Sequence, residues 1–261
     1  MTQRNYDIPI LLEDNHLLCV VKPPNLPVQA DASGDDDLLS ILKRYIGHKY
    51  QKPGAVYLGL VHRLDRPVGG AMVFARTSKA AARLSKAFAC RDTQKQYLAV
   101  LQGKLDAPRT LEDWLKKGPD GMVRVTAPGA DGAKLARLDT EPLCTRDGLT
   151  LARISLHTGR AHQIRVQHAH AGLPLWGDAR YGCGKPGQQI ALWSTSLTFP
   201  HPVAKTPVTL QSLPPDSGAW ALFRDVIFSG KVTLSAPKGS LSEGAVSRRL
   251  TEGVRPGDAE L

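Results

Sequence analysis

A single carboxylate among basic side chains is the group in this sequence best suited to chemistry. Asp65 follows His62, Arg63 and Leu64 and precedes Arg66. Because an adjacent positive charge favours the ionised form of a carboxylic acid, we expect Asp65 to be an anion at neutral pH. An ionised carboxylate on a rigid loop is a candidate nucleophile or general base. From this window alone, a surface aspartate paired with a neighbouring arginine is the simpler interpretation.

The residues on either side of Asp65 predict a loop held between two buried strands. Apolar residues lead into it at 58–61 and out of it at 71–75, and Pro67, Gly69 and Gly70 interrupt the apolar pattern between them. Short apolar runs bounded by proline and glycine are typical of strands joined by a loop. Side chains on such a loop are free to point at a ligand.

The rest of the chain predicts an α+β domain. No long helical pattern interrupts the strand-like runs between 110 and 156, which favours an antiparallel sheet. The acidic residues at 35–37 are expected to cap one helix and Thr77 or Ser78 to cap a second, and Gly172 is expected to close another. The expected helices cover 38–46, 77–90, 160–171 and 220–227, and the expected strands cover 10–12, 17–21, 95–102, 111–115, 123–126, 135–143, 150–156, 190–199 and 207–212.

The net charge indicates a polyanionic partner. The chain has 34 Lys and Arg against 24 Asp and Glu, a formal charge of +10 and a pI near 9.6. Each phosphate that a basic side chain neutralises releases counterions, so such a surplus suits nucleic acid. A charge kept only for solubility is the alternative. Aromatic residues are only 6% of the chain, which argues against a protein that grips single strands mainly by stacking.

Composition also limits the class of protein. Hydrophobic residues at 42% suffice for a sizeable core, and no apolar run approaches the roughly 18 residues of a membrane helix. The N-terminus has no segment of signal-peptide type, and the four cysteines are scattered without a Cys-x-x-Cys pair. These features predict reduced thiols and a cytoplasmic protein.

Nothing in the sequence indicates a metal or another cofactor. His162, His168 and His170 are close in sequence, but on a helix with 3.6 residues per turn the last two point to nearly opposite sides. The three therefore cannot meet at one ion, and there is no phosphate-binding glycine loop.

Four stretches, in this order, resemble the RluA-type pseudouridine synthases. The motif around Asp65 is similar to the active-site motif of that family, and the other three are similar to its N-terminal strand with a Lys-Pro turn, its central tyrosine strand and its third motif. The resemblance runs from about Leu11 to about Pro214. The stretches are 13–24, His62-Arg63-Leu64-Asp65, Lys95-Gln96-Tyr97-Leu98-Ala99-Val100, and 159–166 continuing to Gly177-Asp178 and Tyr181-Gly182.

The resemblance implies a fold and an activity. The fold would be that of the pseudouridine synthases, a mixed and largely antiparallel central sheet flanked by helices, with a basic catalytic cleft. The activity would be isomerisation of uridine to pseudouridine in a stem-loop of ribosomal or transfer RNA, by a monomer. Because this isomerisation transfers no electrons and releases no group, it would need no metal, redox cofactor or nucleotide triphosphate.

The same resemblance implies roles for three catalytic residues. Asp65 would attack the sugar, attack the uracil ring or remove a ribose proton, and the sequence leaves these three routes open. Arg165 would orient the Asp65 carboxylate, since a guanidinium can hold a carboxylate in bidentate geometry. Tyr97 would pack against the target base and could accept its proton. Without the resemblance, Arg165 reads as a helix-surface cation and Tyr97 as an ordinary strand tyrosine.

The expected substrate-binding residues are His62, Arg63, Arg66, Arg160 and His162. Because the target uridine must leave its stack, Arg63 would help to fill the space that the base vacates. His62 would either contact a phosphate or shape the loop, and the sequence leaves both roles open.

The chain departs from the family pattern at two places. Pro67-Val68-Gly69-Gly70 stands where Asp-Thr-Ser-Gly is common, and Leu192-Trp193-Ser194 stands where Leu-His-Ala is common. The resemblance therefore implies neither contacts of this turn with the RNA backbone nor the detail of the pocket near Trp193.

We expect residues 1–229 to form the catalytic domain without a separate N-terminal RNA-binding module, and 230–261 to be a flexible tail.

Two other functions are consistent with parts of the sequence. One is an RNA-binding or RNA-remodelling protein of the same fold with vestigial chemistry. The other is a glycoside hydrolase, which normally needs a pair of carboxylates. Asp178 reads as a turn residue, so the motifs offer Asp65 no second acid as a partner.

Overall fold

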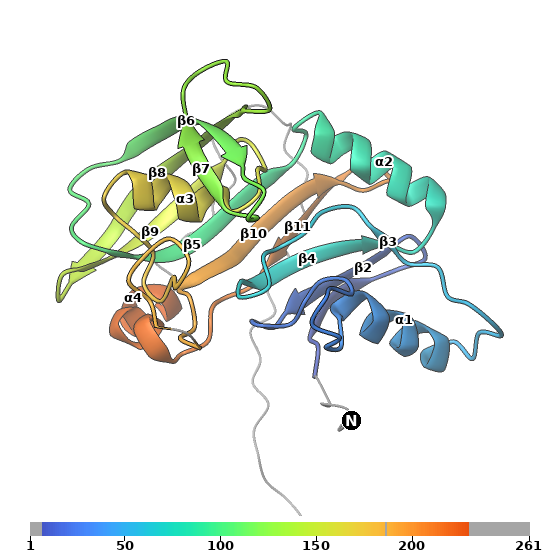
Figure 1. Cartoon of the computed structure of the whole chain (residues 1–261). Coiled ribbons are helices and arrows are strands. Elements are labelled where there is room, and N and C mark those ends of the chain that lie inside the picture. Colours follow the sequence, from blue (N-terminus) through green and yellow to red (C-terminus); the bar gives the residue numbers. More distant parts are fainter. Residues whose placement is uncertain (1–6, 186, 230–261) are drawn as a thin grey trace, which may run out of the picture.

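The structure is a computed structural model that describes residues 7–185 and 187–229. The expected tail at 230–261 lies outside these residues. The described part contains one large sheet with helices on both faces (Figure 1).

Eleven strands make up the sheet, and nine of them follow the order β1-β2-β4-β10-β5-β9-β8-β6-β7, while β11 pairs with β10 and β3 with β4. Of the pairings between described strands, only that of β4 with β10 is parallel. The predicted mixed, largely antiparallel sheet is thus confirmed. The strands are β1 Ile10–Glu13, β2 Leu17–Lys22, β3 Gly59–Leu60, β4 Gly69–Ala75, β5 Gln94–Gln102, β6 Arg109–Lys117, β7 Val123–Thr126, β8 Lys134–Arg146, β9 Leu149–Leu156, β10 Leu192–Pro200 and β11 Pro207–Gln211.

Alternation along the central strand β5 explains why both faces of the sheet are covered. Side chains of a strand point to opposite faces in turn. Tyr97 and Ala99 therefore join one apolar cluster with α1 (Leu38–Lys49) and α3 (Gln163–His170), whereas Leu98 and Val100 join another with the short helices η1 (Gly218–Phe223) and α4 (Arg224–Phe228). The remaining helix, α2 (Ser78–Ala89), packs on β2 and β4 on the side away from α1 (Figure 1).

Side-chain caps begin two of the helices as predicted. The Asp37 carboxylate accepts the backbone N–H of Ser40 at 3.0 Å at the start of α1, and the Thr77 hydroxyl accepts that of Ala80 at 3.2 Å at the start of α2. Such caps satisfy N–H groups that have no partner within the helix. Of the acidic residues at 35–37, only Asp37 serves as the cap.

The predicted start of the third helix at residue 160 is wrong. Helix α3 begins at Gln163, because His162 has a left-handed backbone with φ of 51° and the Gln163 side chain closes the preceding turn by accepting the N–H of Arg160 at 3.0 Å. Residues 160–162 are therefore a turn at the edge of the site. Gly172 does end the helix, with φ of +76°.

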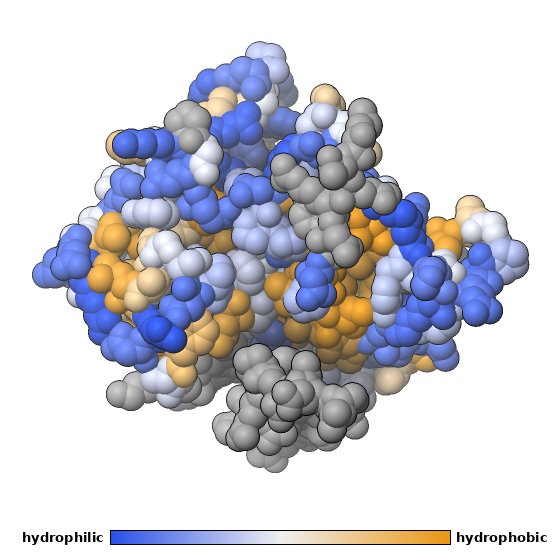
Figure 2. Space-filling model, turned by 90° about the horizontal axis from the view of Figure 1, so that it is seen from below, coloured by the Kyte–Doolittle hydropathy of each residue, from blue (hydrophilic) through white to orange (hydrophobic). Residues whose placement is uncertain are grey.

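The described part of the chain exposes several large hydrophobic side chains. The most exposed are Tyr57, Val203 and Phe228, from distant parts of the described chain. Figure 2 shows one face on which hydrophobic residues gather toward the middle and hydrophilic residues cover most of the periphery. None of the described helices has the length and apolar character needed to cross a membrane.

Candidate active site

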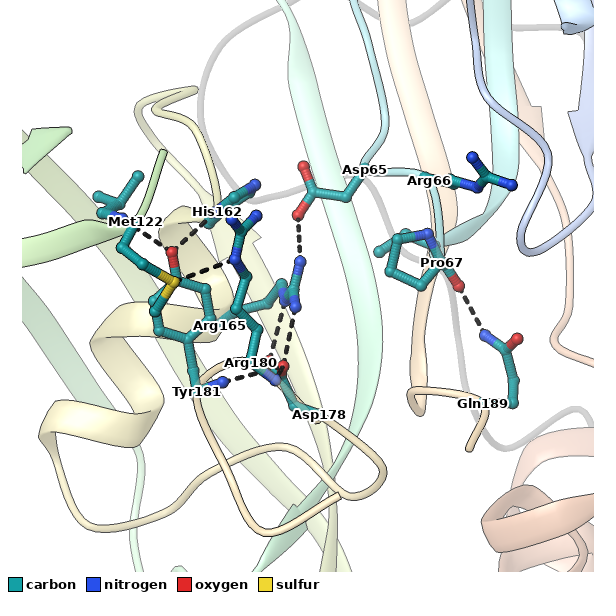
Figure 3. A network of polar contacts seen from close by, with 12 residues as sticks. Asp65, Arg66, Pro67, Met122, His162, Arg165, Asp178, Arg180, Tyr181 and Gln189 are labelled. Carbon is teal, nitrogen blue, oxygen red and sulfur yellow. Dashed lines mark hydrogen bonds and ion pairs between the residues drawn. The ribbon is translucent and has the colours of Figure 1, made fainter. Parts of the chain in front are cut away.

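The Asp65 loop joins β3 to β4, as predicted, and its carboxylate meets a guanidinium. Arg165 Nη1 donates to Asp65 Oδ2 at 3.1 Å, across 100 residues of sequence (Figure 3). The Arg165 side chain is only 7% exposed and that of Asp65 is 27% exposed. The alternative that Arg165 is a helix-surface cation is therefore wrong.

A second carboxylate holds Arg165 from the other side. Asp178 accepts hydrogen bonds from Arg165 Nε at 2.9 Å and Nη2 at 2.8 Å, and from the backbone N–H groups of Arg180 and Tyr181 (Figure 3). Burial alone would raise the pKa of Asp178, but its hydrogen bonds and the Arg165 charge outweigh burial and leave it below its ordinary value. The sequence reading of Asp178 as a turn residue missed this role. Its place in the same motif as Arg165 was the available signal.

Arg66 does not pair with the Asp65 carboxylate, so the simpler interpretation of a pair between Asp65 and a neighbouring arginine does not hold for Arg66. Its guanidinium points away (Figure 3) and binds the acidic loop before α1, where it lies 3.5 Å from Asp31 Oδ2, donates to Ser33 Oγ at 3.0 Å and pairs with Asp35. The cation that touches Asp65 is Arg165. A residue adjacent in sequence can point elsewhere because the loop turns immediately after Asp65.

His62 shapes the loop. Its Nε2 accepts the backbone N–H of Val73 in β4 at 3.0 Å, and its ring stacks on Phe88 of α2 with 4.8 Å between centroids. Burial lowers the pKa of His62 to about 3, so the ring is neutral near pH 7. Of the two roles expected for His62, this geometry favours the shaping of the loop.

Tyr97 lies on β5 and lines the same cleft as Asp65, with only 8% of its surface exposed. Burial, and then the nearby Asp65 charge, raises the pKa of Tyr97 well above its usual value. The phenol therefore stays protonated at neutral pH, which favours packing against a base over acceptance of a proton.

Arg160 and His162 lie in the turn before α3, on the wall of the cleft. Arg160 Nε donates to the Leu135 carbonyl at 3.0 Å. His162 Nδ1 shares a hydrogen bond of 2.7 Å with the Tyr181 hydroxyl, and burial lowers the pKa of His162 (Figure 3). Protein contacts therefore fix both residues in position.

The cleft that contains Asp65 has a volume of about 1330 Å³. This exceeds the roughly 300–1,000 Å³ of ordinary small-molecule sites. Basic side chains line it on several sides, from the loops, β5, β6 and the turn before α3. Besides Arg66 and Arg165, they are Arg63, Arg91, Lys95, Lys117, Arg160 and Arg180.

Across the described residues, no group of three or more His, Cys, Asp or Glu side chains is arranged to hold a metal ion. His168 is instead buried, with Nδ1 bonded to the Ile164 carbonyl at 2.7 Å and Nε2 to the Thr140 hydroxyl at 2.9 Å.

Comparisons with known proteins agree with the motifs. Residues 16–170 match the family model described as RNA pseudouridylate synthase. The ribosomal large subunit pseudouridine synthase D of Nitrosomonas europaea is 33% identical over 205 residues, covering 74% of this chain and 58% of the relative. The protein of the same name from Xanthomonas campestris pv. campestris is 31% identical over 229 residues, covering 80% and 67%. This chain therefore spans about three fifths to two thirds of the length of these relatives.

Solved structures confirm the predicted fold. Human RNA pseudouridylate synthase domain containing 4 matches with a TM-score of 0.67 at 20% identity, covering 85% of this chain and 93% of that one. Human RNA pseudouridylate synthase domain containing 1 matches with a TM-score of 0.63 at 20% identity, covering 86% and 97%.

Proposed function

Because this chain belongs to the RNA pseudouridylate synthase family, we propose that it converts uridine to pseudouridine at defined positions of a structured RNA. Ribosomal RNA is favoured over transfer RNA as the target, since both bacterial relatives described above are named for the ribosomal large subunit. The protein would act as a cytoplasmic monomer on an RNA stem-loop, with the activity contained in residues 1–229.

The reaction sets a limited chemical demand. The bond between the ribose and the uracil nitrogen breaks, and the same sugar carbon then bonds to a ring carbon. That ring carbon loses a proton, and the ring nitrogen gains one. No electrons are exchanged, so the reaction needs no redox group. The chain must supply an anionic oxygen near the junction of sugar and base and a pocket that holds the detached base.

The observation that carries the proposal is the oriented carboxylate in a basic cleft. Within the described residues, Asp65 receives one hydrogen bond from Arg165 through Oδ2, so its other oxygen is available to a substrate. We propose that Asp65 is the nucleophile or base, that Arg165 orients it, and that Tyr97 packs against the uracil.

The size and charge of the cleft support RNA as the substrate. A uridine in folded RNA must be extruded to reach Asp65, which costs a few kcal/mol of stacking. The exposed Arg63 lies in the cleft beside Asp65 and is proposed to fill the space left by the base. Arg160 and His162 are proposed to contact the substrate from the turn before α3. Arg66 and His62 are assigned to loop structure instead, because Arg66 is paired with Asp31 and Asp35 and His62 is held between Val73 and Phe88.

The hydrolase alternative loses support from the position of Asp178. Glycoside hydrolysis normally needs a second carboxyl group that can give up a proton. Both oxygens of Asp178 accept hydrogen bonds from Arg165, its side chain is 1% exposed, and its pKa is low. Asp178 is therefore unsuited to act as an acid.

The direct test uses purified protein and RNA from cells that lack the gene. Ribosomal and transfer RNA would be incubated with wild type, Asp65→Asn or Asp106→Asn and digested, and pseudouridine would be measured by mass spectrometry after chromatography. Asp106 is a matched control, since it is an exposed carboxylate paired with Lys104. Wild type and Asp106→Asn should form pseudouridine, and Asp65→Asn should be slower by about 10³-fold or more. Binding of RNA by wild type without any product would favour the vestigial RNA-binding alternative.

A further inference from the structure

The outward face of α2 carries a row of cations. Lys79, Arg83 and Lys86 are exposed and follow one another at helical spacing, so they share one side of the helix. Arg91, which is also exposed, lies just beyond the end of α2. Arg83 donates to the Pro202 carbonyl at 2.9 Å. Across the described residues, the side chains of Lys79, Lys86 and Arg91 form no hydrogen bond or ion pair.

The segment that contains α2 has no acidic residue to neutralise this row. The sequence has neither Asp nor Glu from 66 to 91. Helix α1 shows the contrary arrangement. Its Arg44 pairs with Asp36 at 3.1 Å, and its Lys49 pairs with Glu13 at 2.7 Å. Because like charges in a row add to one field, the surface of α2 is suited to a polyanion.

The row leads into the cleft that contains Asp65. Arg91 lines this cleft, and so does Lys95 from β5. Lys95 is partly buried, its ammonium lies 5.9 Å from the centre of the Phe88 ring, and none of the described carboxylates pairs with it. Burial, and then the charge of Arg91, lowers the pKa of Lys95. An anion beside these two cations would offset both effects, so this end of the cleft also favours a phosphate.

The rim of the cleft on the α1 side has the opposite charge. Asp31 lines the cleft there, in the loop before α1, and Asp35 and Asp36 follow it. Arg66, the cation at this rim, is paired with Asp31 and Asp35. Helices α1 and α2 pack on opposite sides of β2 and β4 (Figure 1). A phosphate backbone that leaves the cleft would therefore be repelled beside α1 and attracted beside α2.

We propose that α2 is a docking surface for RNA outside the catalytic cleft, where the backbone of the duplex next to the target stem-loop lies along Lys79 and Lys86. Arg91 and Lys95 join this surface to the cleft. The proposal rests on the proposed function, because one RNA molecule occupies both places. Contacts with phosphates give affinity and direction without reading the sequence, so this surface orients the RNA and takes no part in the chemistry. An acidic protein would match the charge equally well, but the continuity with the cleft favours RNA.

The test compares two RNA hairpins that carry the same loop. One has a short stem, and in the other the stem is longer by one helical turn. The Kd of each is measured by fluorescence anisotropy at salt concentrations from about 50 to about 200 mM. Lys79→Met/Lys86→Met removes two charges from α2. Its matched control, Lys43→Met/Lys52→Met, removes two charges from α1 and the loop after it, and none of these four lysines lies in the cleft lining.

For the longer hairpin, we expect Lys79→Met/Lys86→Met to weaken binding about 10-fold at the lowest salt concentration and to reduce the slope of log K against log salt concentration by about 2. For the short hairpin the same variant should match wild type, because that RNA ends within the cleft. Lys43→Met/Lys52→Met should match wild type with both hairpins. With saturating protein, both variants should form pseudouridine in ribosomal RNA at the wild-type rate.

Three results would overturn the proposal. One is unchanged binding of the longer hairpin by Lys79→Met/Lys86→Met. Another is an equal loss with both hairpins, which would mean that α2 adds no contact beyond the cleft. The third is an equal loss in Lys43→Met/Lys52→Met, which would mean that net charge alone governs the affinity. A wild-type protein that forms no pseudouridine would refute the proposed function instead, while the comparison of the two hairpins would still decide whether α2 binds RNA.

Discussion

At the scale of single residues, Arg165 divides its donors between two carboxylates with different surroundings. Asp178 accepts two of its hydrogen bonds and is 1% exposed, whereas Asp65 accepts one and is 27% exposed. Bidentate contact fixes the plane of the guanidinium. Arg165 therefore orients the more exposed Asp65 through one oxygen and leaves the other oxygen without this hydrogen bond, as a reacting carboxylate requires.

Replacement of Asp178 by Asn should destabilise the protein, because it leaves the buried Arg165 with a weaker partner. Removal of one member of a buried ion pair typically costs about 3–5 kcal/mol. The pKa of Asp178 is lowered in the folded state, so its contribution to stability is present above the ordinary aspartate pKa and is lost as pH falls through the folded value. Urea unfolding at pH 7 and near pH 3 should therefore show a smaller acid loss for Asp178→Asn than for wild type.

Asp106→Asn is the control for that experiment, since its exposed pair with Lys104 is screened by solvent and should contribute little to stability. Equal unfolding free energies for Asp178→Asn and wild type at pH 7 would contradict the role assigned to Asp178.

The candidate site could be predicted from the sequence only in part. Asp65, Tyr97 and Arg165 lie in ordered motifs, and the structure brings them to one cleft. The role of Asp178 and the true partners of Arg66 could not be predicted, because side-chain direction depends on contacts between segments that are distant in sequence. Local charge density indicated a basic surrounding, but the contact of Asp65 with Arg165 was expected only from the resemblance, because the two residues lie 100 positions apart.

At the scale of elements, the two departures from the family pattern contact each other. Gly69 in β4 lies opposite Trp193 in β10 within the parallel pairing, and a Cβ atom at Gly69 would overlap the Trp193 ring. The Trp193 indole N–H donates to the Ser212 hydroxyl at 3.1 Å, which fixes the ring there. The unusual glycine and the unusual tryptophan therefore form one packing unit beneath the Asp65 loop.

Gly69→Ala should destabilise the protein by about 1–3 kcal/mol, the usual cost of overpacking a filled core. Trp193→Leu should remove much of the penalty of Gly69→Ala. The double variant should therefore lose less stability than the two single variants lose together, with a coupling energy of about 0.5–3 kcal/mol. Urea unfolding of the four proteins measures this energy. Additive effects would show that the two residues do not share a packing constraint.

Local sequence patterns predicted most of the elements because their signals lie within a few residues. The caps at Asp37 and Thr77 and the strand at 123–126 are examples. The start of α3 was missed because a left-handed conformation at His162 is uncommon for a residue other than glycine and leaves no periodic signal. Likewise, no local pattern specifies which strands pair, so the parallel β4–β10 contact came from the structure alone.

At the scale of the whole molecule, the charge of +10 predicts RNA binding that weakens with salt. Lys117 lines the cleft from β6 and is exposed. If it contacts a phosphate, Lys117→Met should weaken binding to different RNA sequences about equally and reduce the slope of log K against log salt concentration by about 1. Titrations of RNA with protein at salt concentrations from about 50 to about 200 mM measure this slope.

Lys104→Met removes the same charge outside the cleft lining and should leave the slope nearly unchanged. An equal reduction in both variants would mean that total charge, and not the cleft, governs the binding of RNA.

The domain boundary after residue 229 stays a prediction, because 230–261 lie outside the described part of the chain.

The proposed role of the Asp65 carboxylate is to carry out the conversion of uridine to pseudouridine. It is tested most directly by mapping pseudouridine across all RNAs of cells that lack the gene, complemented with either wild type or Asp65→Asn at equal protein levels. We predict that the sites lost on deletion return with wild type and stay absent with Asp65→Asn. Return of the same sites with Asp65→Asn would contradict it.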